Sequence, residues 1–379
     1  MPLYLNEDQA MLADSVTGFL ADEGSIKKQL RHYRDINCKD GFGHALWKQF
    51  AEMGLTGMLA AEADGGLGLG HVEAGAVLKQ IGRNLTPSPF LTTSVMGVTA
   101  LGEASADLKG RYLPGVIAGD MVLAVAIDEG AKHRPERIAA RAERSGNGFR
   151  LSGRKDFVVQ GASADAIIVA ARTSGSDSDA DGITLFAVPK DAAGVGHNSV
   201  RLVDSAMASH VTFDNVELDG SAVIGEVDGG RALLNKVLAA GRLGAAAEQT
   251  GVASGAFDIT TTYLKTRKQF GQLIGEFQAL QHRAAHLYSE LEIADATVMK
   301  AQQLLDAGSE KAELMVAVAK AKAGKASSLA VREGVQMHGG VGMTDEFDIG
   351  LYMKRERALA EFLGDQYYHA QKVAELSGY

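Results

Sequence analysis

The apolar residues of this 379-residue chain change their spacing twice along the sequence, and this change constrains the fold more than any single motif. Residues 1–118 carry apolar side chains at helical spacing. Residues 119–227 alternate short β-branched and aromatic runs with turn sequences, which is typical of strands. Residues 228–379 return to helical spacing. We therefore predict an α+β multidomain chain: an N-terminal all-α domain, a middle antiparallel β barrel or sandwich, and a C-terminal helical bundle.

Local signals mark boundaries within the first two domains. Asn6 and Gln9 have the spacing of a capping box, which predicts the start of a helix. A Ser-Gly-Asn-Gly sequence at 145–148 separates two strand-like runs and predicts a hairpin turn. Residues 173–181 are rich in Ser, Asp and Gly, and we expect them to form an exposed, mobile loop.

The C-terminal domain is predicted to contain four long helices. The first helical pattern covers residues 232–265, and the second forms an apolar stripe from Phe277 to Val298. Two more patterns cover residues 310–336 and about 348–376. Four long helices with short connections predict a four-helix bundle.

Charge and residue usage exclude several classes of protein. The net charge of -9 argues against general affinity for nucleic acid, and no apolar run is long enough to span a membrane. The single cysteine, Cys38, excludes an internal disulfide and fits a reducing compartment. The acidic N-terminus lacks the pattern of a signal peptide, so we expect a cytoplasmic protein. His282 and His338 have no partners at metal-ligand spacing, so we predict no metal.

A basic turn separates the first two of these C-terminal helices. Arg267 and Lys268 precede an aromatic residue and a glycine, and a new helix opens near Glu276. The free N–H groups and the dipole of a helix start favour an anion, and Arg267 could add a bidentate phosphate contact. Basic loops between helices are more often plain solvated turns, so both interpretations stay open at this point.

Three motifs of the chain resemble the signatures of the acyl-CoA dehydrogenase family. Arg-Lys-Gln-Phe-Gly at 267–271, followed by Phe-Gln-Ala at 277–279, is similar to the family's Arg-Lys-x-Phe-Gly and Gln-Ala sequence. Gln-Met-His-Gly-Gly-Val-Gly at 336–342 and Glu-Ala-Asp-Gly-Gly-Leu-Gly-Leu at 62–69 are the other two. The motifs fall in the family's order and span most of the chain. The resemblance implies the family's fold, whose domain order also agrees, with boundaries at 1–118, 119–227 and 228–379.

The resemblance implies FAD as cofactor and an acyl-CoA thioester as substrate. In the family, FAD takes a hydride from the β-carbon while a carboxylate takes the α-proton, and a neighbouring subunit helps to hold the flavin nucleotide. A dimer of dimers and an electron-transfer flavoprotein as partner are implied as well. The residues expected to contact the flavin nucleotide of the neighbouring subunit are Arg267, Gln269, Phe270, Gln278, Gln336, Met337, Gly339 and Gly340.

The β-domain half of the flavin site departs from the family pattern. Family members commonly have Thr-Glu-Pro and then Gly-Ser-Asp after the first strand, where this chain has Ile-Asp-Glu-Gly at 127–130 and no Gly-Ser-Asp. The family's aromatic-Ile-Thr run is replaced by Phe-Val-Val at 157–159, which removes a hydroxyl donor to the flavin. We therefore expect weaker flavin binding by this subunit alone.

The catalytic base is missing from both positions that the family uses. Leu363 stands where many members have glutamate in Tyr-Glu-Gly-Thr, and Gly241 stands at the second location, in the first bundle helix. The next residue, Arg242, matches a frequent family arginine and is expected to bind substrate. Asp365 and Glu248 are the candidate replacement bases, and a third alternative is that this chain has none. The competing interpretations are a helix N-cap or a flavin contact for Asp365, and a carboxylate paired with a cation for Glu248.

Three functions are compatible with these features. The first is an acyl-CoA dehydrogenase that forms the α,β-enoyl-CoA, with a sterol side chain or another bulky acyl group as a plausible substrate. The second is a non-catalytic or half-site subunit that completes a flavin site on a partner carrying the glutamate. The third is a flavin oxidase or monooxygenase on the same fold. The acyl chain, the electron acceptor and the choice between homo- and hetero-oligomer stay open.

Overall fold

The computed structural model describes residues 2–379, and its first segment is helical as predicted. Helix α1 (Glu7–Asp22) begins at the predicted capping box: Asn6 Oδ1 accepts the Gln9 backbone N–H at 2.8 Å, and the Asn6 N–H donates to Gln9 Oε1 at 3.0 Å. The other α-helices of this segment are α2 (His32–Asp35), α3 (His44–Glu52), α4 (His71–Asn84), α5 (Val98–Leu101) and α6 (Ala106–Ile117). Short π-helical turns η1 (Lys27–Arg31) and η4 (Leu91–Gly97) and 3₁₀ turns η2 (Leu55–Gly57) and η3 (Glu62–Asp64) lie between them.

Residues 119–227, all of which the structure describes, form a β-sheet and confirm the predicted β domain. The strand order is β6-β7-β3-β2-β4-β5-β8, with β1 beside β4. The predicted turn at 145–148 joins β2 and β3. Most neighbours are antiparallel, but β1 and β2 both run parallel to β4, so the sheet is not antiparallel throughout, as the predicted barrel or sandwich would be. Parallel strands need a long connection between them, and here the β2–β3 hairpin lies in the connection from β1 to β4.

The strands are β1 (Leu123–Ala126), β2 (Arg141–Ser145), β3 (Gly148–Val159), β4 (Ala166–Arg172), β5 (Ile183–Pro189), β6 (Val195–Arg201), β7 (Met207–Leu218) and β8 (Val223–Ile224), with the turn η5 (Gly220–Ala222) before β8.

The loop between β4 and β5 is largely exposed, as predicted, but hydrogen bonds from the buried Arg172 side chain hold it in place. This side chain is 1% exposed. Its guanidinium donates to the backbone carbonyls of Ile138, Asp177, Asp179 and Asp181 at 2.5 to 3.4 Å. Carbonyl oxygens therefore satisfy a buried cation that the composition of the loop did not reveal.

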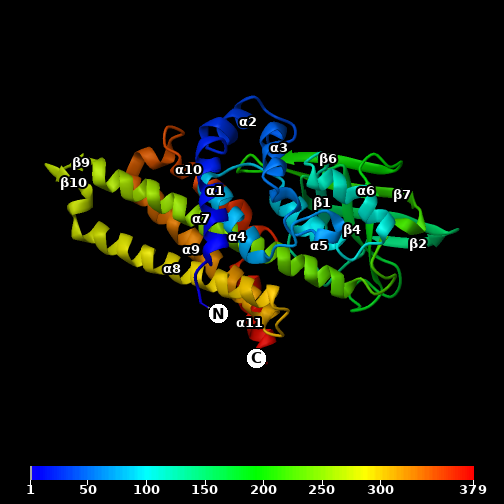
Figure 1. Ribbon diagram of the computed structural model, residues 1–379. Helices are drawn as coiled ribbons and strands as arrows, with labels where there is room; N and C mark the ends of the chain where they lie inside the picture. The colour runs from blue at the N-terminus through cyan, green and yellow to red at the C-terminus, as the bar shows by residue number, and fades with distance from the viewer. Residues whose placement is uncertain (1) are drawn as a thin grey trace. The chain divides into compact units, whose positions relative to one another are not determined.

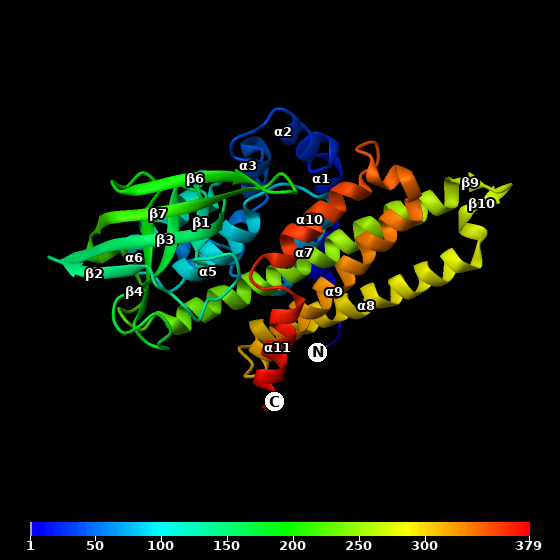
Figure 2. The same ribbon diagram turned by 180° about the vertical axis from the view of Figure 1, so that it is seen from behind.

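Residues 228–379, also described in full, hold five α-helices instead of the four predicted. The predicted fourth helix is broken at Leu363 and Gly364, whose φ angles are +58° and +101°. Left-handed backbone of this kind ends a helix. Figures 1 and 2 show α7, α8 and α9 side by side, with a small hairpin of β9 and β10 at one end. The elements are α7 (Arg231–Thr266), β9 (Lys268–Gln269), β10 (Gln272–Leu273), η6 (Ile274–Glu276), α8 (Gln278–Asp306), α9 (Ala312–His338), η7 (Gly339–Met343), α10 (Ile349–Glu361) and α11 (Gln366–Leu376).

The chain divides into two compact units, which we call the helical unit and the sheet unit. The helical unit contains residues 2–32, 71–86 and 242–379, and the sheet unit contains residues 33–70 and 87–241. This grouping differs from the three domains expected from the sequence, whose boundaries stay a prediction. No helix within residues 2–379 is both long enough and apolar enough to cross a membrane.

Glycines bring α4 and α7 into close contact inside the helical unit. A Cβ atom on Gly82 would lie 2.1 Å from the carbonyl oxygen of Glu248, and one on Gly251 would lie 1.9 Å from that of Lys79. Because no larger residue fits such an approach, these glycines fix the position of α7 against α4. The same contact sets which residues of α7 face α4 and which face the later helices.

Candidate active site

The predicted basic turn forms the β9–β10 hairpin at the end of α7 (Figure 1). Phe270 at its tip has a left-handed φ of +54° and is 94% exposed. Its ring meets the ring of Phe277 edge to face, with 6.3 Å between centroids. Arg267 and Gln269 are exposed as well. An aromatic side chain held in solvent beside a cation is suited to contact another molecule.

The second predicted motif, at the end of α9, packs against the base of this hairpin. Met337 is 5% exposed and lies in a cluster with Leu264 and Ile274. Its side chain is therefore part of the core, which leaves its backbone for any ligand. The exposed members of the motif are Gln336, Gly339 and Gly340, and a Cβ on either glycine would have no atom within 4 Å.

The start of α8 adds further exposed groups that are suited to contact a ligand. Gln278 is the first residue of this helix and is exposed, and Phe277 at the N-cap provides no side-chain cap. The uncapped N–H groups can therefore donate to an anion. We call this set the hairpin surface, defined by Arg267, Gln269, Phe270, Gln278, Gln336, Gly339 and Gly340. This surface combines a cation, amide groups, an aromatic ring and accessible backbone, which suit the phosphate, sugar and base of a nucleotide.

Asp365 lies at the corner between α10 and α11, where it caps a helix. Its Oδ1 accepts the backbone N–H groups of Tyr367 at 3.0 Å and Tyr368 at 2.8 Å. In the same corner His369 Nε2 lies 3.0 Å from the carbonyl oxygen of Leu363. Leu363 itself is 4% exposed. The corner is thus held by its own polar contacts, and it presents an aliphatic side chain where a carboxylate was expected from family resemblance.

Glu248 is buried within the helical unit and forms an ion pair. It is 2% exposed, and Arg355 of α10 donates to its Oε1 through Nε at 2.8 Å and Nη2 at 2.5 Å. The two residues are 107 positions apart in sequence, so no local pattern could pair them. The structure thus matches the cation-paired interpretation of Glu248.

Arg242 is half-buried on α7 and contacts α11. Its Nη2 donates to the Tyr368 hydroxyl at 3.1 Å, and its guanidinium carbon lies 5.5 Å from the centre of the Tyr368 ring. Lys372 Nζ lies 5.9 Å from the same ring centre. Both cations lie beside one phenol ring, and Lys372 is also paired with Glu375 at 2.8 Å.

Two buried titratable groups near this corner were missed from the sequence. Lys320 of α9 is 1% exposed and donates to the Leu359 carbonyl at 3.0 Å. Burial lowers the pKa of Lys320 to about 7, against the attraction of Glu356 and Asp365. Burial also raises the pKa of the Glu356 carboxyl, which is 6% exposed. The signal in the sequence was a charged residue, Lys320 or Glu356, at an apolar position of a helical pattern. Such residues are seldom buried without a partner.

The sheet unit uses its own carboxylates to satisfy the loop that follows β1. Asp128 accepts the Arg134 backbone N–H at 3.0 Å and lies 2.9 Å from His133 Nδ1. Glu129 accepts the backbone N–H groups of Ala139 and Ala140 at 2.7 and 2.9 Å.

Glu129 also accepts a hydrogen bond from Lys155 Nζ at 2.7 Å. Lys155 is fully buried, and burial lowers its pKa against the attraction of Glu129. Three backbone N–H groups of this loop and the Lys155 ammonium are therefore engaged within the protein, which leaves fewer donors open to a flavin. Among residues 2–379 there is no cluster of three or more His, Cys, Asp or Glu side chains arranged for a metal, and the absence of a metal stays a prediction.

Comparison with known proteins identifies the family of the chain. Family models match the chain over almost its whole length: the acyl-CoA dehydrogenase N-terminal domain at residues 6–120, the middle domain at 128–216 and the C-terminal domain at 228–377. The chain belongs to the acyl-CoA dehydrogenase family and is an oxidoreductase of that family. The fold predicted from the motifs is thereby confirmed, and FAD is the cofactor typical of the family.

Individual relatives agree with this assignment. A 3-(aryl)acrylate reductase of Clostridium sporogenes is 30% identical over 331 residues, which cover 85% of this chain and 87% of the relative. Acyl-CoA dehydrogenase FadE12 of Mycobacterium tuberculosis is 29% identical over a region that covers 93% of this chain and 91% of the FadE12 chain.

Two solved structures are also similar. A variant of the Tcur3481–Tcur3483 steroid ACAD has a TM-score of 0.88 at 30% identity, covering 98% of both chains. The ChsE4–ChsE5 complex of Mycobacterium tuberculosis has a TM-score of 0.89 at 25% identity, covering 100% of both chains.

Proposed function

We propose that this chain is the half-site subunit of a heteromeric FAD-dependent acyl-CoA dehydrogenase whose related partner subunit carries the catalytic glutamate. The reaction is the α,β-desaturation of an acyl-CoA thioester. One observation carries the proposal: both carboxylates that could replace the missing base hold the fold together, Glu248 through Arg355 and Asp365 through the start of α11. Carboxylates engaged in this way are poorly placed to accept a substrate proton.

The hairpin surface supplies this chain's share of the flavin site. Arg267 brings a cation to a phosphate, Gln269 and Gln278 bring amide groups, and Gly339 and Gly340 let backbone approach closely. When bound, FAD accepts the hydride from the β-carbon of the substrate. The occupied donors around Asp128 and Glu129 favour a flavin held mainly by the partner's β domain. Arg242 is assigned to substrate binding, next to Tyr368.

The two similar solved structures support an assembly of unlike subunits. One is described as the Tcur3481–Tcur3483 steroid ACAD and the other as the ChsE4–ChsE5 complex, each naming two chains. By analogy we assign this chain to a dimer of dimers acting on a steroid-derived or similarly bulky acyl-CoA. Reoxidation by an electron-transfer flavoprotein and a cytoplasmic location complete the proposal.

The test is anaerobic spectroscopy of the chain purified alone and of the assembly purified from its native cells. We expect the isolated chain to show little flavin absorption and no bleaching by a panel of acyl-CoA thioesters. The native assembly is expected to bleach, and to keep bleaching when this chain carries Glu248→Gln or Asp365→Asn.

Bleaching of the isolated chain that either substitution abolishes would instead make it a self-sufficient homomeric dehydrogenase. Rapid reaction of the reduced flavin with oxygen would point to the oxidase or monooxygenase alternative. Neither outcome is compatible with a half-site subunit.

A further inference from the structure

A cavity of about 410 Å³ lies within the helical unit, lined by residues of α4, α7, α8 and the N-terminal segment. Its volume is in the range of small-molecule sites. None of its lining residues belongs to the hairpin surface or to the α10–α11 corner. An inference about this cavity is therefore independent of the proposed flavin chemistry.

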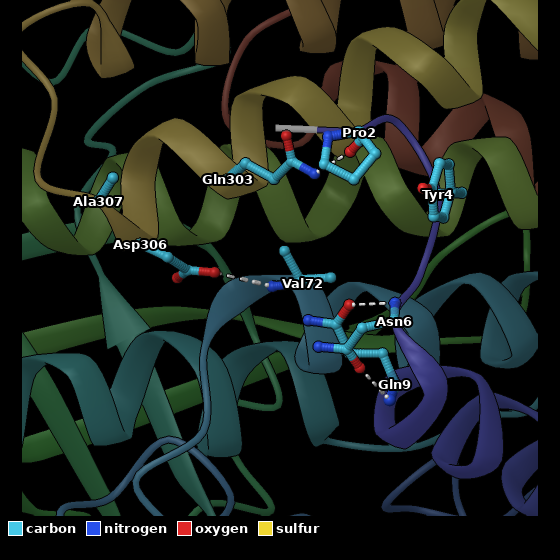
Figure 3. Close-up of a pocket in the computed structure, with 8 residues that line it drawn as sticks. All are labelled: Pro2, Tyr4, Asn6, Gln9, Val72, Gln303, Asp306 and Ala307. Carbon is cyan, nitrogen blue, oxygen red and sulfur yellow. Dashed lines mark hydrogen bonds between the residues drawn. The ribbon is translucent and has the colours of Figure 1, made fainter.

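Residues 2–5, which we call the strap, are tethered at both ends beside this cavity. At one end Gln303 Nε2 donates to the Pro2 carbonyl at 2.6 Å. Figure 3 shows this contact in a neighbouring pocket that shares Tyr4 and Val72 with the cavity. At the other end the strap enters the capping box of α1, where Gln9 Nε2 donates to Glu73 of α4 at 2.9 Å. The strap has no secondary structure of its own. It can therefore cover the cavity while yielding to admit a ligand.

Two glutamine side chains distinguish the cavity from a packing gap. Gln302 lines it and is 4% exposed, and its side chain makes no hydrogen bond to any residue from 2 to 379. Gln80 also lines it, and its buried Oε1 likewise has no partner within these residues. An unpaired buried amide oxygen costs roughly 1–3 kcal/mol, so the Gln80 side chain gains from a partner in the cavity. The Gln302 amide lines the same cavity and is available to the same ligand.

The position of Gln302 is built into α4. A Cβ atom on Gly75 would lie 1.7 Å from Gln302 Nε2, so glycine is required for the amide to occupy this place. Thr250 of α7, 5% exposed, adds a hydroxyl to the lining. The remaining wall is largely aliphatic and includes Val72 and Val298.

The charges that line the cavity are largely compensated. Lys79 Nζ lies 2.7 Å from Asp295, and Arg83 Nη2 lies 2.6 Å from Asp258. Both cations of the lining are thus paired, and the carboxylate of Glu292 lies in the same lining, so the cavity disfavours an anionic ligand. Amides facing an aliphatic wall suit a neutral molecule with one polar end.

We infer that this cavity binds a small uncharged molecule that carries an amide or hydroxyl group, with Gln302 and Gln80 as its hydrogen-bonding partners. The apolar part of such a molecule lies against the aliphatic wall. The strap closes over it. No covalent or redox step is involved.

The test uses benzamide and N-propylacetamide as probes, with benzoate as a charged probe of the same shape as benzamide. Binding to the full-length chain is measured by saturation-transfer NMR titration. We expect saturable binding of both amides, and at least tenfold weaker binding of benzoate. Gln302→Leu keeps the volume but removes the amide, and is expected to weaken benzamide binding by about fivefold.

Two cavity-filling variants locate the site. Ala76→Leu on α4 and Ala296→Leu on α8 each fill the cavity from a different helix, so one suffices if the other fails to fold. Both are expected to abolish amide binding. Ala285→Leu, on an exposed position of α8 outside the lining, is the matched control and should bind as wild type. Absence of saturable amide binding, equal binding of benzoate, or unchanged binding in a folded cavity-filling variant would overturn the inference.

Discussion

At the scale of single residues, the account depends on Glu248 being structural. A buried carboxylate with a bidentate arginine partner is strongly destabilised when the pair is broken, because the remaining charge loses its partner. Arg355 keeps 27% of its side chain exposed, which moderates the effect. We expect Glu248→Gln to lower the free energy of unfolding by about 2 kcal/mol in urea denaturation.

A double variant provides the control for this prediction. Replacing both partners, Glu248→Met with Arg355→Met, removes the buried charges together and should recover most of the lost stability. If Glu248→Gln leaves stability unchanged but stops acyl-CoA bleaching in the native assembly, Glu248 is a base and not a structural group.

Lys320 makes a second prediction at this scale, concerning pH. Its pKa is lowered to about 7 in the folded protein, from an ordinary value of 10.5. Between these values the unfolded chain binds more protons than the folded one, so stability must rise with pH. From pH 7 to pH 9, wild type should gain on the order of 2 kcal/mol relative to Lys320→Met in chemical denaturation.

Lys322→Met is the matched control for Lys320, since Lys322 lies on the same helix in a partly exposed pair with Glu290. This variant should keep the wild-type pH dependence. Identical pH slopes for wild type and Lys320→Met would show that the folded lysine titrates normally.

At the scale of secondary-structure elements, the α10–α11 corner depends on its N-cap. Asp365→Ala removes the acceptor of two backbone N–H groups and should lower the free energy of unfolding, measured by thermal denaturation, by about 1 kcal/mol. Asp365→Asn keeps an acceptor and should be nearly neutral, because asparagine caps as well as aspartate. Equal loss from both substitutions would contradict the capping role.

The β4–β5 loop depends on Arg172 in the same way. Arg172→Met removes four hydrogen bonds to backbone carbonyls, and we expect faster hydrogen exchange across residues 173–182 and about 3 kcal/mol lower stability. Arg141→Met is the control, because exposed Arg141 reaches this loop only from its surface, through the Gly175 carbonyl and the Asp177 carboxylate at 3.7 Å. Unchanged exchange in the Arg172 variant would mean that the loop orders itself.

Periodicity and caps made much of this element structure predictable. The capping box of Asn6 and the long helix α7 followed from local sequence. The break at Leu363 did not, because a non-glycine residue with positive φ leaves little trace in sequence. The pairing of Glu248 with Arg355 could not be predicted either, since it joins separate helices.

At the scale of the whole molecule, family motifs predicted the fold and the hairpin surface. They did not predict that the two candidate bases, Glu248 and Asp365, hold the fold together.

The hairpin surface leads to a prediction about FAD binding. Arg267→Ala with Phe270→Ala should leave melting unchanged, since both side chains are exposed, and should weaken FAD retention by the native assembly about tenfold. Lys265→Ala, on the exposed end of α7, is the control and should retain FAD. Full FAD retention in the double variant would exclude the hairpin from the flavin site.

The most direct test of the half-site proposal is the composition of the native assembly, measured by native mass spectrometry with FAD still bound. The account predicts equal numbers of this chain and of a second acyl-CoA dehydrogenase-family chain that carries the glutamate. It also predicts one FAD for each such pair. A homotetramer of this chain alone, with one FAD per chain, would contradict it.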